Sequence, residues 1–174
     1  GCYGDGGAIF TSDDDLAKAM REIRVHGQEK RYVHTRVGVG GRMDTIQCAV
    51  VLAKLERFEW EVEQRLRIGG RYNDLLAGKI KTVVQRSDRT SVFAQYTVFV
   101  ENRDAVQRQL SENGIPTAVH YPIPLNEQPA YKHLCCPDCT PIAKATAKKV
   151  MSLPMSPDLT EADQDQIVVA VLTC

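Results

Sequence analysis

Hydrophobic and polar positions along the chain follow two periods, which predicts a mixture of strands and helices. Residues 8–11 form a short apolar run typical of a strand, and the apolar positions after it recur at helical spacing as far as Gly27. Ser12, followed three residues later by Asp15, is expected to cap that helix. Residues 28–44 show no sustained period, so they predict a long, basic, glycine-rich loop.

The middle of the chain predicts continuous helix and a domain boundary. Residues 46–55 are apolar almost all round, so a helix here belongs in a core or in a subunit interface. The charged residues 56–71 carry the helical pattern on, and Gly78 ends it. We therefore expect three parts: the end of one domain over residues 1–60, a connecting helix over 61–78, and a small α+β domain over 79–174.

The rest of the chain alternates between strand and helix patterns, which indicates an α/β protein. Strands are expected at residues 82–85, 91–101 and 117–120, and helices at 102–112, 140–150 and 160–172. Thr160 and Asp163 form a capping pair for the last helix. Three prolines after residue 120 force an extended loop.

Composition removes several classes of function. The 174 residues are 43% hydrophobic and 25% charged, with 22 basic and 22 acidic residues, so bulk charge attracts neither nucleic acid nor a membrane surface. No apolar run approaches the roughly 18 residues of a membrane span. We therefore expect no nucleic-acid partner and no membrane partner.

Six cysteines raise the question of a metal or redox site: Cys2, Cys48, Cys135, Cys136, Cys139 and Cys174. Cys136 and Cys139 have the C-x-x-C spacing of zinc and redox motifs, but no second pair of ligands stands at a suitable distance. The simpler interpretation is a loop with reduced thiols in a cytosolic protein. We expect no metal site.

Two places carry candidate functional side chains. Arg42 follows a flexible glycine-rich segment and could clamp a carboxylate or a phosphate, although pairing with Asp44 or with a carbonyl is an equal alternative. His120 and Tyr121 enter the proline-stiffened loop. On spacing alone, a tyrosine half-buried under that loop and a hydrogen-bonded surface histidine are the more ordinary interpretation.

Several motifs in order resemble one known family. The glycine-rich opening of residues 1–8, the segment Gly38–Asp44, the run His120–Tyr131 and the closing segment 153–161 are similar to the DegT/DnrJ/EryC1/StrS sugar-nucleotide aminotransferases. Residues 19–28 look most like the branch that acts on UDP-linked 3-keto sugar acids. The resemblance implies the C-terminal half of an α/β enzyme of fold type I that depends on pyridoxal 5'-phosphate.

The resemblance also implies roles for particular residues. Arg42 matches an arginine that reaches the active site of the neighbouring subunit, and His120 and Tyr121 match residues that line the sugar-nucleotide pocket. Gly40 stands where the family has an asparagine that helps to hold the cofactor phosphate, so the cofactor contacts of this chain stay open: either the cofactor is held less tightly, or another group takes over. The run His120–Tyr131 departs from the family at Asn126, and no role is carried over there.

The family's cofactor lysine is expected upstream of Gly1, so we expect no catalytic residue in this chain. The resemblance then implies a cytoplasmic, homodimeric enzyme that moves an amino group from glutamate to a keto group of a UDP-sugar for surface polysaccharides, and a chain that is inactive alone. The alternative is a non-catalytic domain that binds a sugar nucleotide or has a regulatory role. A thiol or metal module built on Cys135, Cys136 and Cys139 is a third hypothesis.

Overall fold

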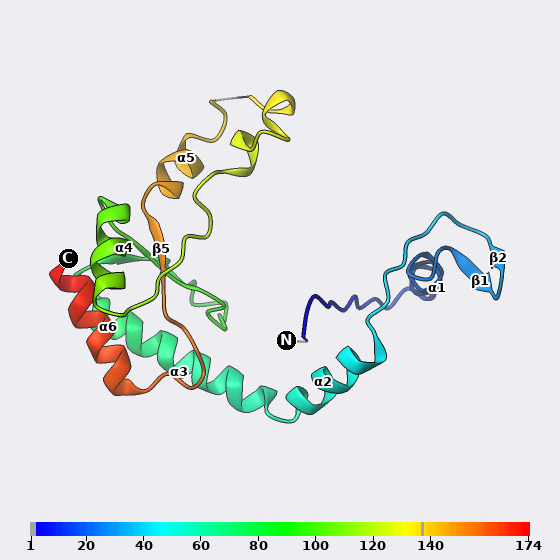
Figure 1. Cartoon of the computed structure of the whole chain (residues 1–174), viewed down its shortest axis with the longest axis horizontal. Coiled ribbons are helices and arrows are strands. Elements are labelled where there is room, and N and C mark those ends of the chain that lie inside the picture. Colours follow the sequence, from blue (N-terminus) through cyan, green and yellow to red (C-terminus); the bar gives the residue numbers. More distant parts are fainter. Residues whose placement is uncertain (1–2, 137) are drawn as a thin grey trace. The chain divides into compact units, whose positions relative to one another are not determined.

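A computed structural model describes residues 3–136 and 138–174 (Figure 1). Residues 1, 2 and 137 lie outside the described part. The first two belong to the glycine-rich opening and include Cys2; the third is the proline between Cys136 and Cys139. The chain divides into two compact units, residues 1–59 and residues 60–174. No helix of the described residues is both long enough and apolar enough to span a membrane.

The first unit begins with an extended segment and a short helix. The predicted strand at residues 8–11 is wrong: the segment pairs with no strand, and the Phe10 side chain is 91% exposed. An extended run becomes a strand only when a neighbour satisfies its backbone groups. Helix α1 (Asp14–Ile23) follows, and its cap is Asp13 rather than Ser12, because the Asp13 carboxylate accepts the Leu16 N–H at 2.9 Å.

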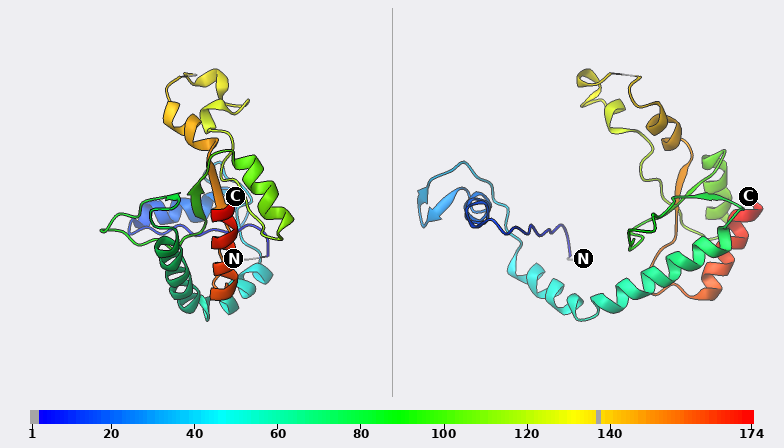
Figure 2. Two further views of the ribbon diagram at one scale, coloured as in Figure 1. Left: turned by 90° about the vertical axis from the view of Figure 1, so that its left-hand side faces the viewer. Right: turned by 180° about the vertical axis from the view of Figure 1, so that it is seen from behind.

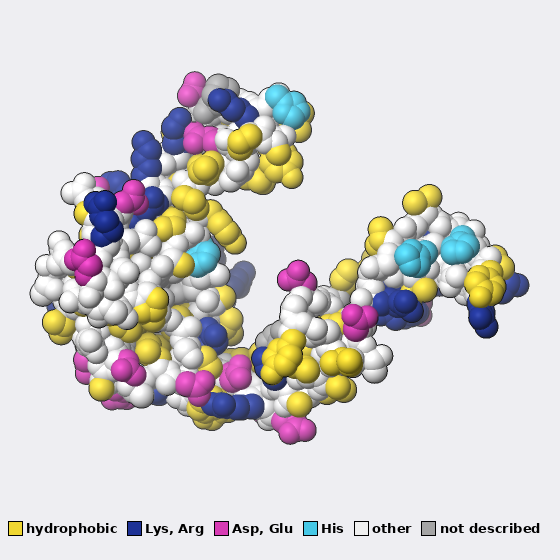
Figure 3. Space-filling view, viewed as in Figure 1, with side chains coloured by type: hydrophobic (Ala, Val, Ile, Leu, Met, Phe, Trp, Pro, Cys, Tyr) yellow, Lys and Arg dark blue, Asp and Glu magenta, His cyan; other side chains and the backbone are white. Residues whose placement is uncertain are grey.

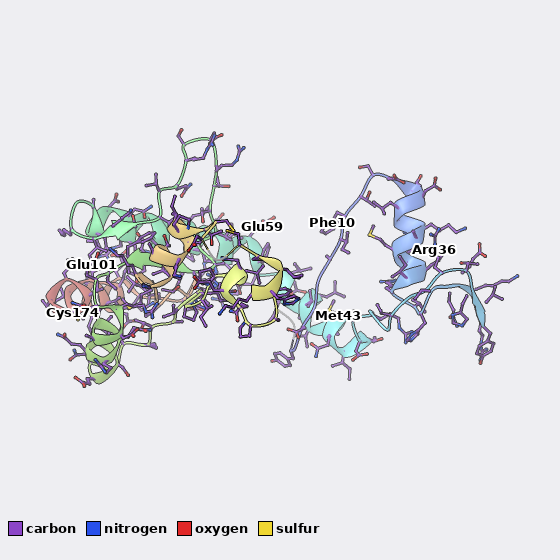
Figure 4. The ribbon with its side chains drawn as sticks, turned by 90° about the horizontal axis from the view of Figure 1, so that it is seen from above. Phe10, Arg36, Met43, Glu59, Glu101 and Cys174 are labelled. Carbon is purple, nitrogen blue, oxygen red and sulfur yellow. The ribbon has the colours of Figure 1, made fainter. Side chains whose placement is uncertain are left out.

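The predicted loop of residues 28–44 contains a small hairpin, β1 (Gln28–Lys30) paired with β2 (Val33–His34). The backbone just before this segment passes so close to the backbone near Arg36 that only glycine fits at residue 27. Gly27 has a φ of +77°, and a Cβ on it would lie 1.8 Å from the Arg36 carbonyl oxygen. The Arg36 side chain, labelled beside α1 in Figure 4, pairs with the buried Glu22 at 2.7 Å. A glycine-rich sequence is therefore held in one conformation by close backbone contact and an ion pair.

The expected continuous helix is two helices, α2 (Thr45–Leu55) and α3 (Phe58–Leu76), separated at residues 56–57. Gly78 follows α3 with a left-handed φ of +70°, in agreement with the expected stop. None of the α2 residues is buried, and Ile46 is 78% exposed. Within the described residues this helix therefore lies in no core, and the other expected location, a subunit interface, stays a prediction.

The second unit is built on a three-stranded antiparallel sheet in the order β3 (Lys81–Thr82), β4 (Tyr96–Phe99), β5 (Val150–Leu153). The sequence predicted a helix through Val150, so β5 was missed; α5 (Pro141–Ala147) ends sooner. The expected strand at 117–120 is reduced to a single bridge from Ala118 to Ser152 of β5.

Helices complete the second unit: α4 (Arg103–Glu112) and α6 (Glu161–Thr173) join α3 around the sheet. Figures 1 and 2 show α6 alongside α3, and pairs Arg67–Glu161 and Arg71–Asp165 show that the two helices run in the same direction. As predicted, Thr160 caps α6 by accepting the Asp163 N–H. The buried hydrophobic cluster draws on α3, β4, α4, the segment after α4, β5 and α6: Ile68, Tyr72, Leu76, Tyr96, Val98, Leu110, Ile115, Met151, Leu153, Ile167, Val168 and Val171.

Strand β4 begins later than the predicted residue 91, and Phe93 is the cause. Its φ of +46° breaks the extended backbone, and its carbonyl accepts the Arg65 guanidinium at 3.3 Å. The Phe93 ring lies directly over Gly69 of α3, where a Cβ would come within 2.2 Å of the ring. The alternation that predicted a long strand therefore includes a residue that anchors the preceding loop to a helix.

Candidate functional site

His120 is positioned by the sheet of the second unit. It follows the Ala118–Ser152 bridge, and its Nδ1 lies 3.0 Å from the Ser152 hydroxyl oxygen. Ser152 is buried within β5. Because the sequence pattern missed β5, this partner of the imidazole was also missed; the only available signal was a serine within an apolar run. The hydrogen bond fixes one ring nitrogen and so sets the orientation of the imidazole.

Tyr121 points outward next to this fixed ring. Its side chain is 73% exposed, and its ring meets the His120 ring edge to face with centroids 5.7 Å apart. The peptide bond between the two residues is cis. The structure thus brings together the two residues that the sequence singled out, with one ring tethered and a phenol open to a ligand.

A groove of about 600 Å³ lies beside this pair. Its walls come from the proline-rich loop, α5 and the start of β5: His120, Tyr121, Pro122, Ile123, Pro124, Leu125, Gln128, Ala143, Thr146, Ala147 and Val150. In Figure 3, hydrophobic side chains gather on this face of the second unit. An apolar groove with a few polar groups at one end is the usual form of a small-molecule site.

Asn126, at the position where the sequence departs from the family, lies in the short 3₁₀ turn Leu125–Glu127. Its side-chain nitrogen is buried and has no hydrogen-bond partner among the described residues. The next residue, Glu127, pairs with Lys144 of α5 at 3.0 Å, which ties the loop to the far wall of the groove.

Arg42 belongs to the first unit, and its side chain is exposed. Within the described residues, neither an ion pair nor a hydrogen bond joins it to Asp44, and Asp44 caps α2 without a side-chain bond. The alternative role as a structural partner of Asp44 is therefore not what the structure contains. Arg42 lies in the first unit, and the His120–Tyr121 pair lies in the second.

All nine lysines are exposed: Lys18, Lys30, Lys54, Lys79, Lys81, Lys132, Lys144, Lys148 and Lys149. A lysine that forms a Schiff base with a cofactor is usually desolvated or placed next to another cation, which lowers its pKa. Here the pKa values of Lys18 and Lys144 are instead raised, above all by hydrogen bonds to Glu29 and Glu127 respectively. None of the nine lysines is buried among the described residues, and the absence of the cofactor lysine from this chain stays a prediction.

The cysteine cluster has an internal hydrogen bond but no metal geometry. The Cys139 thiol donates to the Cys136 carbonyl at 2.8 Å. Hydrogen bonds from the Asp138 backbone and then from Cys139 lower the pKa of the Cys136 thiol. Over residues 3–136 and 138–174, no group of three or more histidine, cysteine or acidic side chains is arranged to hold a metal ion.

The structure resembles solved aminotransferases. It superimposes on S. venezuelae DesV in complex with a ketimine intermediate with a TM-score of 0.93 and 32% identity, covering 99% of this chain and 47% of that one. It superimposes equally well, with a TM-score of 0.93 and 44% identity, on a DegT DnrJ EryC1 StrS aminotransferase from Brucella abortus, covering 98% of this chain and 46% of that chain. The expected α/β fold of these enzymes is confirmed.

The sequence identifies the family. The DegT/DnrJ/EryC1/StrS aminotransferase family matches residues 2–172, and the chain belongs to this family. The UDP-2-acetamido-2-deoxy-3-oxo-D-glucuronate aminotransferase of Pseudomonas aeruginosa is 50% identical over 99% of this chain and 48% of the relative. The chain thus spans about half the length of the curated relatives it matches.

Proposed function

We propose that this chain forms part of an enzyme that moves an amino group from glutamate to a keto group of a UDP-linked sugar, with pyridoxal 5'-phosphate as cofactor. The observation that carries the proposal is the family match over residues 2–172, together with 50% identity to an aminotransferase for a UDP-linked 3-oxo sugar acid. We also propose a place in the biosynthesis of surface polysaccharides such as lipopolysaccharide O-antigen.

The cofactor supplies an electron sink when it is bound. Because every lysine here is exposed, we place the cofactor lysine in polypeptide outside this chain. In the proposed enzyme, residues 1–60 complete the large cofactor-binding domain, 61–78 form the connecting helix, and 79–174 form the small domain. The isolated chain is then inactive as an aminotransferase.

The substrate contacts that we propose are Arg42, His120 and Tyr121. The Arg42 guanidinium, which forms no ion pair among the described residues, can bind an anionic group of the substrate with two parallel hydrogen bonds. Ser152 holds the His120 imidazole in one orientation, and the exposed Tyr121 phenol can donate to a sugar or phosphate oxygen at the mouth of the groove. These residues would bind and orient the sugar nucleotide.

A homodimer in the cytoplasm is the assembly that we propose. The exposed apolar side chains of α2 support it, since Ile46, Leu52 and Leu55 are each more than half exposed in the single chain. Apolar surface of this kind is normally covered by another protein surface.

The test uses a protein of full family length that contains this chain, assayed for transfer from glutamate to a UDP-linked 3-keto sugar acid. His120→Ala and Tyr121→Phe should each lower kcat/KM for the sugar nucleotide by about tenfold or more, the loss of one to two hydrogen bonds to a charged group. Tyr131→Phe, an exposed tyrosine in the same loop region, is the matched control. Equal effects of all three substitutions would refute the assignment.

The second candidate function is a non-catalytic sugar-nucleotide-binding or regulatory domain. Measuring binding by this chain alone distinguishes it from the aminotransferase. Calorimetry with a UDP-sugar, without pyridoxal phosphate, should give no micromolar binding if the site needs the remaining polypeptide. Micromolar binding that is lost in Tyr121→Phe would favour the binding domain.

A further inference from the structure

We propose that Cys136 and Cys139 form a reversible redox pair, which a small dissolved disulfide such as glutathione disulfide converts from two thiols into one disulfide bond. This bond cross-links the segment that joins the two walls of the groove in the second unit. The pairing does not depend on the transfer reaction proposed above, so each can fail without the other.

The two thiols lie beside each other on the surface of the second unit. Both residues are exposed, so a small dissolved disulfide can reach them. The Cys139 thiol donates to the Cys136 carbonyl at 2.8 Å, which keeps its side chain turned back toward residue 136. A hydrogen bond also joins the two side chains. Thiols that already touch are within reach of a disulfide bond.

Their surroundings give the two sulfurs different roles. Hydrogen bonds from the Asp138 backbone and then from the Cys139 thiol lower the pKa of Cys136. The hydrogen bond to Cys136 is the largest cause of the raised pKa of Cys139. Because the thiolate is the nucleophile in disulfide exchange, Cys136 is the attacking thiol and Cys139 the resolving thiol.

The reaction consists of two exchange steps. The Cys136 thiolate attacks one sulfur of glutathione disulfide, so a mixed disulfide forms and one glutathione leaves as a thiolate. Cys139 then loses its proton to solvent and attacks the Cys136 sulfur, which expels the second glutathione. Two protein thiols are oxidised by two electrons, and one glutathione disulfide is reduced to two glutathione thiols.

Cys135 stands next to the pair without belonging to it. Its side chain is half-buried, whereas those of Cys136 and Cys139 are exposed. Among the described residues, no hydrogen bond joins its sulfur to either of the other two. It therefore provides a matched control, a third thiol in the same segment.

The position of the pair connects it to the groove. One wall ends at Gln128 and the other begins at Ala143 of α5, so both cysteines lie in the connection between the walls. The ion pair of Glu127 with Lys144 already holds the walls together. In Figure 1 the yellow part of this connection leads into α5. A disulfide removes conformational freedom from the connection, so oxidation restricts how far the walls can separate.

The chemistry is tested on a protein of full family length that contains this chain. The protein is reduced, freed of reductant and treated with glutathione disulfide, and its alkylated peptides are mapped by mass spectrometry. Wild type should end with residues 136 and 139 joined and with no glutathione on either. Cys139→Ser should stop with glutathione on Cys136, because the resolving thiol is missing.

Two further variants test the assigned roles. Cys136→Ser should take up glutathione at Cys139 at least about threefold more slowly than Cys139→Ser takes it up at Cys136, which is roughly the effect of one pKa unit on the rate of exchange. Cys135→Ser should form the disulfide at a rate within about twofold of wild type. Dithiothreitol should return wild type and Cys135→Ser to the reduced form.

The effect on the groove is measured by hydrogen exchange of the peptide 140–147, which includes the Lys144 amide bonded to the Thr140 carbonyl at 3.1 Å. Oxidation should slow its exchange by up to about twentyfold, the effect of closing a loop of four residues. Exchange of α6, over residues 161–173, should not change. The double variant Cys136→Ser/Cys139→Ser, treated in the same way, should show no slowing.

Several results would overturn the proposal. Glutathione that persists on wild-type Cys136, or a disulfide that uses Cys135, would exclude the pairing. A Cys139→Ser variant that retains no glutathione would exclude Cys136 as the attacking thiol. Exchange of residues 140–147 that is the same in oxidised and reduced wild type would exclude an effect on the groove.

Discussion

Adjacent glycines in α3 give a sharp test of the packing in the second unit. Replacing glycine with alanine inside a helix normally stabilises a protein by about 0.5–1 kcal/mol, because alanine loses less backbone freedom on folding. Gly70→Ala should follow this rule, since a Cβ there meets nothing within 4 Å. Gly69→Ala should not, because a Cβ there would lie 2.2, 2.4 and 2.6 Å from three atoms of the Phe93 ring.

The size of the effect follows from the position of that ring. The atom at 2.6 Å is Phe93 Cγ, which rotation of the ring about its own axis cannot move away. The backbone is also held, by the bond from Arg65 to the Phe93 carbonyl. Overpacking of this kind costs about 1–3 kcal/mol. The gain in helix propensity cancels between the two variants, so Gly69→Ala should be about 1–3 kcal/mol less stable than Gly70→Ala.

Urea unfolding followed by circular dichroism at the helical band measures this difference. The double variant Gly69→Ala/Phe93→Ala is the control for mechanism: without the ring, the alanine at position 69 should stabilise relative to Phe93→Ala alone. If Gly69→Ala proves as stable as Gly70→Ala, the Phe93 ring does not rest on α3, and the account of why β4 is short is wrong.

Two further predictions concern pH. The hydrogen bond from Arg36 lowers the pKa of Glu22, so this carboxylate stabilises the fold above about pH 4.3, and the effect is lost as the pH falls through its lowered pKa. Glu22→Gln should therefore destabilise the first unit at pH 7. Hydrogen exchange of the hairpin amides should show that the difference in stability between the variant and wild type narrows toward pH 3. Burial raises the pKa of Tyr96 to about 12, so the neutral phenol stabilises the fold fully below about pH 10 and less as the pH rises toward 12. Over that range the free energy of unfolding in urea should fall more steeply for wild type than for Tyr96→Phe. Parallel losses in the two proteins would contradict this.

The helices were largely predictable, because their signals are local. The cap formed by Thr160 and Asp163, and the glycine that follows α3, are both present as the sequence indicated. The strands were predicted less well: β4 lies inside the predicted residues 91–101 and β3 overlaps the predicted 82–85, but a strand depends on a partner far away along the chain. Residues 8–11 have a strand pattern but no partner, whereas β5 has four consecutive buried residues and was taken as the end of a helix and the start of a loop.

The candidate site likewise contains residues that the sequence indicated and residues that it did not. Arg42, His120 and Tyr121 could be found because they stand in recognisable segments, and their roles are still proposals. Ser152 could not be found, since it reaches its place only through backbone pairing, by the bridge to Ala118. Sequence motifs identified side chains, and the fold supplied their neighbours.

The hydrogen bond between Ser152 and His120 makes the groove depend on the register of β5 against β4. Ser152 sits opposite Thr97 in the β4–β5 pairing, and a slip of one residue would send its hydroxyl through the sheet to the other side. The imidazole would then lose its hydrogen bond to the Ser152 hydroxyl, although no residue of the groove had changed. Under the role proposed for His120, substitutions in β4 that shift this register would therefore change sugar-nucleotide binding.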